Sequence, residues 1–240
     1  MNRIITCLFP AVVPAILHAQ ATAPLQQTIG PALAPTVFLT DINGKRSLEE
    51  WNRHEVKGSA FLVDNWGTAI VTLTDKRKYE KVPIRLNCVN NSIHYRSANN
   101  EELVAPAGMI REILLVDSSE KGMKEYDIAS GYPAIGKFNE NTFYERKING
   151  KAQLLVYTKK RLMELNTMGS AGKDLEYQSL ELVYLYKDGV IREWKKDKDL
   201  LINFLSDKKD AVTEYIRTTK LKCRNMEDVK QVLQYYNGLF

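Results

Sequence analysis

The spacing of hydrophobic residues changes once along the chain, near residue 197. Before that point, apolar and polar residues tend to alternate in short runs bounded by Asn, Asp and Gly. After it, apolar residues recur every three or four positions. A period of two is typical of strands, and a period of 3.6 is typical of amphipathic helices. The pattern predicts an α+β protein: an antiparallel β-sheet or partly rolled barrel of about 8–10 strands, then a helical tail of about three helices.

Two dipeptides predict the clearest hairpins. Asn149-Gly150 separates the strand-like runs 143–148 and 152–157, and this pair predicts a type I′ turn. Asp188-Gly189 predicts a second hairpin, between 178–186 and 190–194. Further strands are expected at 60–63, 68–74, 79–89, 92–96 and 109–116, with long loops at 118–141 and 166–176.

Three helical faces follow one another in the tail. Asp207 and Asn225 stand where they could act as N-caps of the second and third helices. We expect the tail to pack on the sheet or on itself; a helix that docks on a partner is the alternative. The apolar faces comprise Leu200, Leu201, Phe204 and Leu205; Val212, Tyr215 and Ile216; and Val229, Leu233 and Tyr236.

The first residues have the parts of a secretory signal peptide. Arg3 precedes an apolar stretch that ends at Leu17, and Ala19-Gln20-Ala21 provides small residues for cleavage. The stretch is shorter than the roughly 20 apolar residues that span a bilayer, and two prolines interrupt it. We therefore expect cleavage near Ala21, a mature chain without a transmembrane segment, and a periplasmic or extracellular location.

Composition shifts divide the chain into four parts. Residues 22–36 contain three prolines and no charge, which is typical of an extended segment rather than a core. The predicted organisation is a signal peptide at 1–21, an extended leader at 22–56, an antiparallel β region at 57–196 and a helical tail at 197–240.

Composition and charge exclude several classes of protein. The 240 residues are 44% hydrophobic and 26% charged, which is enough apolar material for one core and unlike collagen, disulfide-dense or fully disordered chains. The net charge of +5 is spread thinly and forms no concentrated basic stripe. We therefore expect no nucleic-acid partner.

Cys88 and Cys223 are the cysteines that remain after cleavage. An exported protein meets an oxidising compartment, so a disulfide between them is one alternative. Such a bridge would close a long loop and stabilise the fold by about 4–5 kcal/mol at most. Two separate buried thiols are the other alternative. Neither cysteine belongs to a C-x-x-C pair, so a zinc or redox site has no support.

The sequence contains no recognisable catalytic, metal or cofactor-binding residues. It lacks a G-x-S-x-G motif. His94 alternates with Ile93 and Tyr95, so we expect it on the opposite, solvent-facing side of a strand. Glu101 and Glu102 are adjacent, so they point to opposite faces and are expected to be solvated. A hydrolase built from carboxylates paired only in the fold stays open.

Tyrosines are mildly enriched. Half-buried packing is the ordinary explanation, and an aromatic contact surface for a sugar or protein is the alternative. The candidates for that surface are Tyr184, Tyr186, Tyr235 and Tyr236.

The layout of the chain resembles small secreted proteins of unknown function from Bacteroidota-type bacteria. The resemblance rests on Lys57-Gly58-Ser59 at the start of the β region and on three segments of the tail: Asp199-Leu-Leu201, Lys208-Lys209 and Gln234-Tyr-Tyr-Asn237. It implies export and an order of sheet then helices. It implies no catalytic residues.

These observations favour an exported, soluble, non-enzymatic envelope protein that binds an unknown protein or a small apolar ligand. A lipid or small-molecule carrier and a hydrolase of unrecognised type are the alternatives. A carrier predicts an unfilled apolar cavity, and a hydrolase predicts perturbed carboxylates that converge in one cleft. A binding module predicts an exposed aromatic patch.

Overall fold

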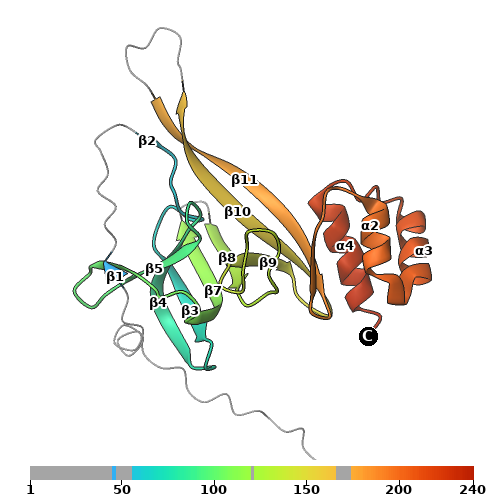
Figure 1. Ribbon diagram of the computed structural model, residues 1–240, viewed down its shortest axis with the longest axis horizontal. Helices are drawn as coiled ribbons and strands as arrows, with labels where there is room; N and C mark the ends of the chain where they lie inside the picture. The colour runs from blue at the N-terminus through green and yellow to red at the C-terminus, as the bar shows by residue number, and fades with distance from the viewer. Residues whose placement is uncertain (1–44, 47–55, 120–121, 166–173) are drawn as a thin grey trace, which may run out of the picture. The chain divides into compact units, whose positions relative to one another are not determined.

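The computed structural model describes residues 45–46, 56–119, 122–165 and 174–240. The predicted signal peptide and most of the predicted leader lie outside these ranges. The described residues form one β-sheet and, after it in the chain, three α-helices (Figure 1). None of these helices has the length and apolar character needed to cross a bilayer.

The sheet contains twelve strands in the described part of the chain, ten of them with three residues or more. They are β1 Lys45–Arg46, β2 Val56–Lys57, β3 Gly67–Leu73, β4 Lys78–Asn87, β5 Ser92–Arg96, β6 Glu102–Val104, β7 Ile110–Ser119, β8 Gly122–Ala129, β9 Tyr144–Ile148, β10 Ala152–Leu165, β11 Asp174–Lys187 and β12 Val190–Glu193. Their spatial order is β1-β6-β5-β4-β3-β7-β8-β9-β10-β11-β12. All these neighbours are antiparallel, whereas β2 pairs with β11 in parallel, so the sheet is mixed.

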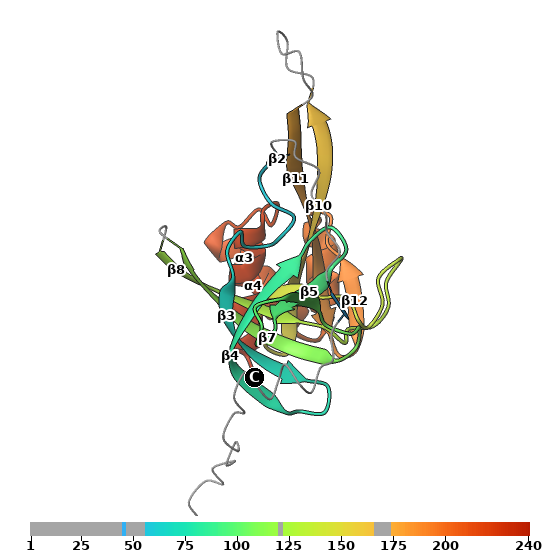
Figure 2. The same ribbon diagram turned by 90° about the vertical axis from the view of Figure 1, so that its left-hand side faces the viewer.

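The sheet curls into a half-barrel, and β3, β4, β5 and β7 lie together in its first half (Figure 2). The prediction of an α+β fold with a rolled sheet and a helical tail is confirmed. Alternation gives the sheet one buried face, because every second residue of β3 is buried: Ala69, Val71 and Leu73 point inward, and Ile70 points outward.

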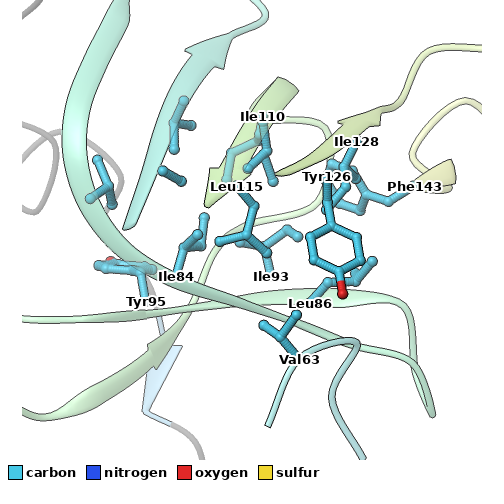
Figure 3. Close-up of a cluster of buried hydrophobic side chains, with 14 of the residues drawn as sticks. Val63, Ile84, Leu86, Ile93, Tyr95, Ile110, Leu115, Tyr126, Ile128 and Phe143 are labelled. Carbon is cyan, nitrogen blue, oxygen red and sulfur yellow. The ribbon is translucent and has the colours of Figure 1, made fainter. Parts of the chain in front are cut away.

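The first hydrophobic cluster is formed by the inward faces of β3, β4, β5, β7 and β8. Ile84, Ile93 and Leu115 come from three different strands, and their side chains meet in its centre (Figure 3). Each is at most 2% exposed. Burial of such a side chain contributes about 1.5–3 kcal/mol, so this cluster is a main source of stability for the first half of the sheet.

The second cluster lies between the sheet and the tail. The helices α2 Lys198–Phe204, α3 Lys209–Thr219 and α4 Met226–Asn237 pack their apolar residues around Leu154 and Leu185 of β10 and β11. Asn225 accepts a hydrogen bond from Asp228 N and caps α4, as predicted. Asp207 does not cap a helix. It lies in a 3₁₀ turn, Ser206–Lys208, where it accepts a hydrogen bond from the Tyr236 hydroxyl at 2.7 Å.

Two predictions about strands and loops are wrong. The polar stretch 118–141 contains strand β8, which pairs along its whole length with β7. Its outer half is polar because that half is exposed, and only Tyr126 and Ile128 carry a strand-like signal. The run 60–63 forms a single bridge, between Phe61 and Asn87, instead of a strand. The predicted loop 166–176 ends with the start of β11, and residues 166–173 lie outside the described ranges.

The two Gly-containing hairpins differ. Asp188 and Gly189 have φ angles of 48° and 79°, which suit a type I′ turn. The connection 149–151 has three residues and only Gly150 has a positive φ angle, so the type I′ prediction is wrong there. A distant side chain explains the difference: Asn237 of α4 accepts from Ala152 N and donates to Ala152 O, both at 2.9 Å. A Cβ atom at Gly150 would lie 2.5 Å from the Asn237 amide.

Candidate ligand-binding cleft

A cleft of about 480 Å³ opens where four segments meet. They are the β4–β5 turn, the β6–β7 connection, the segment between β8 and β9, and the middle of β10. Its volume falls within the range of about 300–1,000 Å³ that is usual for ligand sites. The lining comprises Val89, Asn90, Asn91, Ser92, Ile93, Ala105, Pro106, Ala107, Lys137, Phe138, Asn139, Asn141, Thr142, Phe143, Tyr157 and Lys159.

The lining has an unusual polar composition. It contains four asparagines, two lysines, a serine and a threonine, but no aspartate or glutamate. Three aromatic residues, Phe138, Phe143 and Tyr157, supply the larger apolar surface. The cleft therefore combines amide groups, positive charge and aromatic rings, a set that suits a polar, negatively charged ligand.

Reciprocal hydrogen bonds hold two walls of the cleft together. Asn91 adopts a left-handed conformation with φ 55°, which ends the β4–β5 turn. Its amide nitrogen donates to Phe143 O at 3.0 Å, and its amide oxygen accepts from Phe143 N at 2.7 Å. Both atoms of this amide are thus committed to structure, and the two walls are held at a fixed separation.

The other asparagines keep unused hydrogen-bonding groups. Asn90 Oδ1 accepts from the Ser92 backbone and hydroxyl, and Asn139 Oδ1 accepts from Asn141 N at 3.0 Å. Their amide nitrogens have no partner among the described residues, and the Asn141 side chain has none for either atom. The cleft thus offers three amide donors and one amide acceptor to a ligand.

Lys137, Lys159 and the neighbouring Arg161 give the cleft a positive rim. Desolvation, followed by the proximity of Lys137 and Arg161, lowers the pKa of the Lys159 ammonium. No carboxylate of the described residues forms an ion pair with any of the three. A bound anion would relieve this mutual repulsion, so the rim favours ligands of negative charge.

The aromatic wall is rigid and neutral. The Phe138 ring is half-buried and lies 4.4 Å from the Tyr157 ring, centroid to centroid. Desolvation raises the pKa of the buried Tyr157 hydroxyl, so it stays protonated at neutral pH. The Lys137 ammonium lies 5.4 Å from the Phe138 centroid, which places a cation beside the apolar surface.

Ser92, His94 and Glu102 have spacings like those of a nucleophile, a base and its orienting acid. Ser92 Oγ lies 3.0 Å from His94 Nε2, and His94 Nδ1 lies 2.6 Å from Glu102 Oε1. The Ser92 hydroxyl also lies 2.6 Å from Asn90 Oδ1, and its single proton can be donated to only one of these two groups. The network holds the turn that carries Asn90 and Asn91, whereas His94 itself is 1% exposed and does not line the cleft.

Both expectations for His94 and Glu102 are wrong. His94 is 1% exposed rather than solvent-facing, because the Phe61 ring covers it edge-on at a centroid distance of 5.2 Å. Glu102 is only 30% exposed, and its second oxygen accepts from Arg85 Nη2 at 2.8 Å. Phe61 is distant in sequence from His94, so the pattern of β5 alone could not show that His94 is buried.

The two cysteines are free thiols in different places. Cys88 is buried in the first cluster and Cys223 in the second. Burial raises the pKa of Cys88 to about 12 and that of Cys223 to about 11. Both therefore remain protonated and unreactive near neutral pH.

The four tyrosines do not form an aromatic contact surface, so that prediction is wrong. Tyr184 is 3% exposed and Tyr236 is fully buried, while Tyr186 and Tyr235 are half-buried. The pairs also lie on different elements, β11 and α4. Tyr235 stacks on Tyr215 of α3 at 4.1 Å, so it contributes to the packing of two helices.

The structure bears on the two alternative functions. Side chains fill the inner face of the curled sheet, and the cleft beside it is open and polar rather than an enclosed apolar cavity. The carboxylates with a lowered pKa, Asp75, Asp207 and Glu214, lie on separate elements and do not converge. Within the described ranges, no three His, Cys, Asp or Glu side chains come together as a metal site.

No family model, curated protein or solved structure matches the chain. The resemblance to small secreted proteins therefore stays a prediction. The geometry and charge of the cleft are the basis for a functional proposal.

Proposed function

We propose that this chain is an exported, non-enzymatic binding protein whose cleft holds an anionic carbohydrate. One observation carries the proposal: the lining combines unused asparagine amides with lysines and aromatic rings, and contains no carboxylate. Export is supported by the signal-peptide pattern of the sequence.

The amides favour a carbohydrate. A side-chain amide places a donor and an acceptor side by side, which matches neighbouring hydroxyl groups on a sugar ring. Asn141 has both groups free, and Asn90 and Asn139 each have a free nitrogen. The half-buried Phe138 ring adds an apolar face against which a sugar ring can pack.

The charge of the cleft favours an acidic sugar. Lys137 and Lys159 line it, and Arg161 follows Lys159 by two positions on β10, on the same face of the strand. Successive carboxylates or sulfates of an acidic oligosaccharide could pair with these cations. A neutral sugar would leave their mutual repulsion unrelieved.

Binding is favoured over catalysis by the position of His94. A general base must reach the substrate, but His94 is 1% exposed and does not line the cleft. The lining itself contains no histidine, cysteine, aspartate or glutamate.

Titration calorimetry with an oligogalacturonate and a neutral maltooligosaccharide of equal length tests the proposal. We expect binding of the acidic sugar only, weakened by added salt. Lys159→Gln and Asn141→Ala should each weaken it about tenfold or more. Lys81→Gln, at an exposed position outside the cleft, is the matched charge control. Equal affinity for both sugars, equal loss in the control, or no binding at millimolar sugar would refute the proposal.

A further inference from the structure

A second hollow, of about 580 Å³, lies in the tail, where the connection from β12 to α2 meets the connection from α3 to α4. Its lining comprises Lys196, Asp197, Lys198, Leu221, Lys222 and Arg224. None of these residues belongs to the cleft. We infer that this hollow is a separate binding site for a phosphate group.

The lining contains four cations and a single carboxylate. Asp197 Oδ1 accepts from the backbone N–H of Asp199 at 2.9 Å and of Leu200 at 3.1 Å. That carboxylate is therefore committed to the start of α2. Among the described residues, none of the four cations forms an ion pair, so their charge is available to a ligand.

Both connections hold their cations on a fixed backbone. Asp228 Oδ2 accepts from Lys222 N at 3.0 Å and from Cys223 N at 2.8 Å, which pins the α3–α4 connection. The Trp194 indole donates to Asp197 O at 3.1 Å and pins the β12–α2 connection. The carboxylate of Asp228, like that of Asp197, is used by backbone donors. Because hydrogen bonds hold both backbones in place before any ligand arrives, less conformational entropy is lost on binding.

The number and kind of cations match a phosphate group. A phosphate monoester carries about 1.5–2 negative charges near pH 7 and three acceptor oxygens. The Arg224 guanidinium can bind two of these oxygens side by side, and ammonium groups can neutralise the rest. A ligand with a single carboxylate would neutralise only a small part of the positive charge of these four side chains. Free phosphate and a phospholipid headgroup share the chemistry, and the hollow is open enough to admit either.

Two arms of one experiment identify the source of the phosphate. In the first, NMR titration of the full chain with inorganic phosphate and glycerol phosphate follows the amide shifts of Lys196, Lys222 and Arg224. In the second, sedimentation at about 0.05 M salt compares phosphatidylglycerol vesicles with phosphatidylcholine vesicles. Saturable shifts at these amides assign the site to phosphate groups in general. Binding to phosphatidylglycerol alone assigns it to the headgroup.

Matched variants separate a site from general charge. Lys222→Gln/Arg224→Gln should weaken whichever binding is observed about tenfold or more. Lys76→Gln/Lys81→Gln removes the same charge from exposed positions that line neither hollow, and should change binding by less than about twofold. Equal loss in the two double variants, or no binding in either arm, would overturn the inference. The outcome for the cleft is independent of this test, because the cleft variants Lys159→Gln and Asn141→Ala are measured by sugar binding.

Discussion

The two main hydrophobic clusters are assembled in different ways. In the first, the sheet covers itself: β3, β4, β5, β7 and β8 curl until their inward faces meet. In the second, β10 and β11 are covered by helices that come later in the chain. A curled sheet needs only alternating residues on consecutive strands. A sheet covered by helices needs contacts that position the helices, and here polar side chains provide them.

A few specific polar contacts join the helical tail to the sheet at the second cluster. Asn237 hydrogen-bonds both backbone groups of Ala152, and Asp207 receives the Tyr236 hydroxyl and pairs with Lys187. The first cluster has a comparable polar network at its outer side, where Glu102 joins His94 to Arg85. Alternation alone therefore builds the first cluster, whereas the second depends on contacts that no local pattern shows.

The largest expected effect tests whether the two clusters unfold together. Leu115→Ala in the first and Leu154→Ala in the second each remove a fully buried side chain. Each should lower the free energy of unfolding by about 2–5 kcal/mol. Urea unfolding followed in single-tryptophan chains, with Trp66 reporting on the first half-sheet and Trp194 on the second cluster, checks this. We expect coincident transitions, because β8, β9 and β10 are one continuous sheet. Separate transitions would show two independent units.

Glu102→Ala should have the next largest effect. It leaves the buried His94 Nδ1 without its partner and removes an ion pair from Arg85. A loss of about 2–3 kcal/mol in chemical denaturation is expected. Glu80→Ala, an exposed glutamate on β4, removes the same charge and should cost less than about 0.5 kcal/mol. Equal costs would mean that the network contributes no more than a surface charge.

Asn237→Ala measures the joint between α4 and the β9–β10 hairpin. It removes two hydrogen bonds to Ala152, so we expect a loss of about 1–2 kcal/mol. Asn237→Asp keeps the acceptor for Ala152 N but places a carboxylate oxygen against Ala152 O, so it should cost at least as much as the alanine variant. Gln234→Ala, on the exposed face of α4, is the control for helix propensity. A cost no larger than the control's would show that packing alone places the helix.

The smallest effect concerns acid. Desolvation raises the pKa of Asp207, but hydrogen bonds from Lys187 and Tyr236 outweigh it, so the pKa is lowered overall. A lowered folded pKa adds stability above the unfolded value of 3.8, and this stability is lost as pH falls through the folded value. Asp207→Asn should therefore flatten the stability curve below about pH 4. The carboxylate is 37% exposed, so the change is small. Asp210→Asn serves as the control. If its stability curve flattens at low pH as much as that of Asp207→Asn, the acid dependence does not come from Asp207.

Much of the fold could be predicted from local patterns. The strand 92–96 and the Asn225 cap follow directly from alternation and from helix-start chemistry. Strand β8 could not be found in this way, because most of its first half is exposed on both faces and carries polar residues. Its place is set by pairing with β7, which the sequence of β8 alone does not encode.

The cleft was harder to predict than the fold. Asn90 and Asn91 fell between the predicted strands 79–89 and 92–96, and Lys137 to Asn141 fell within a predicted loop. The contact that unites them, between Asn91 and Phe143, spans 52 residues of sequence. The available signal was a similarity in composition: both loops are rich in Asn. That similarity becomes a prediction only when the loops are known to meet.

The parallel pair of β2 and β11 has a consequence for the order of folding. Val56 pairs with Leu175, so a strand made early must find a partner that is synthesised more than a hundred residues later. The amide of Lys160 likewise donates to Cys88 O, across a long sequence separation. Contacts of such high contact order form slowly. A nascent chain therefore carries an unfinished sheet edge until the β10–β11 hairpin has emerged, and that interval is when a holdase chaperone would protect it most.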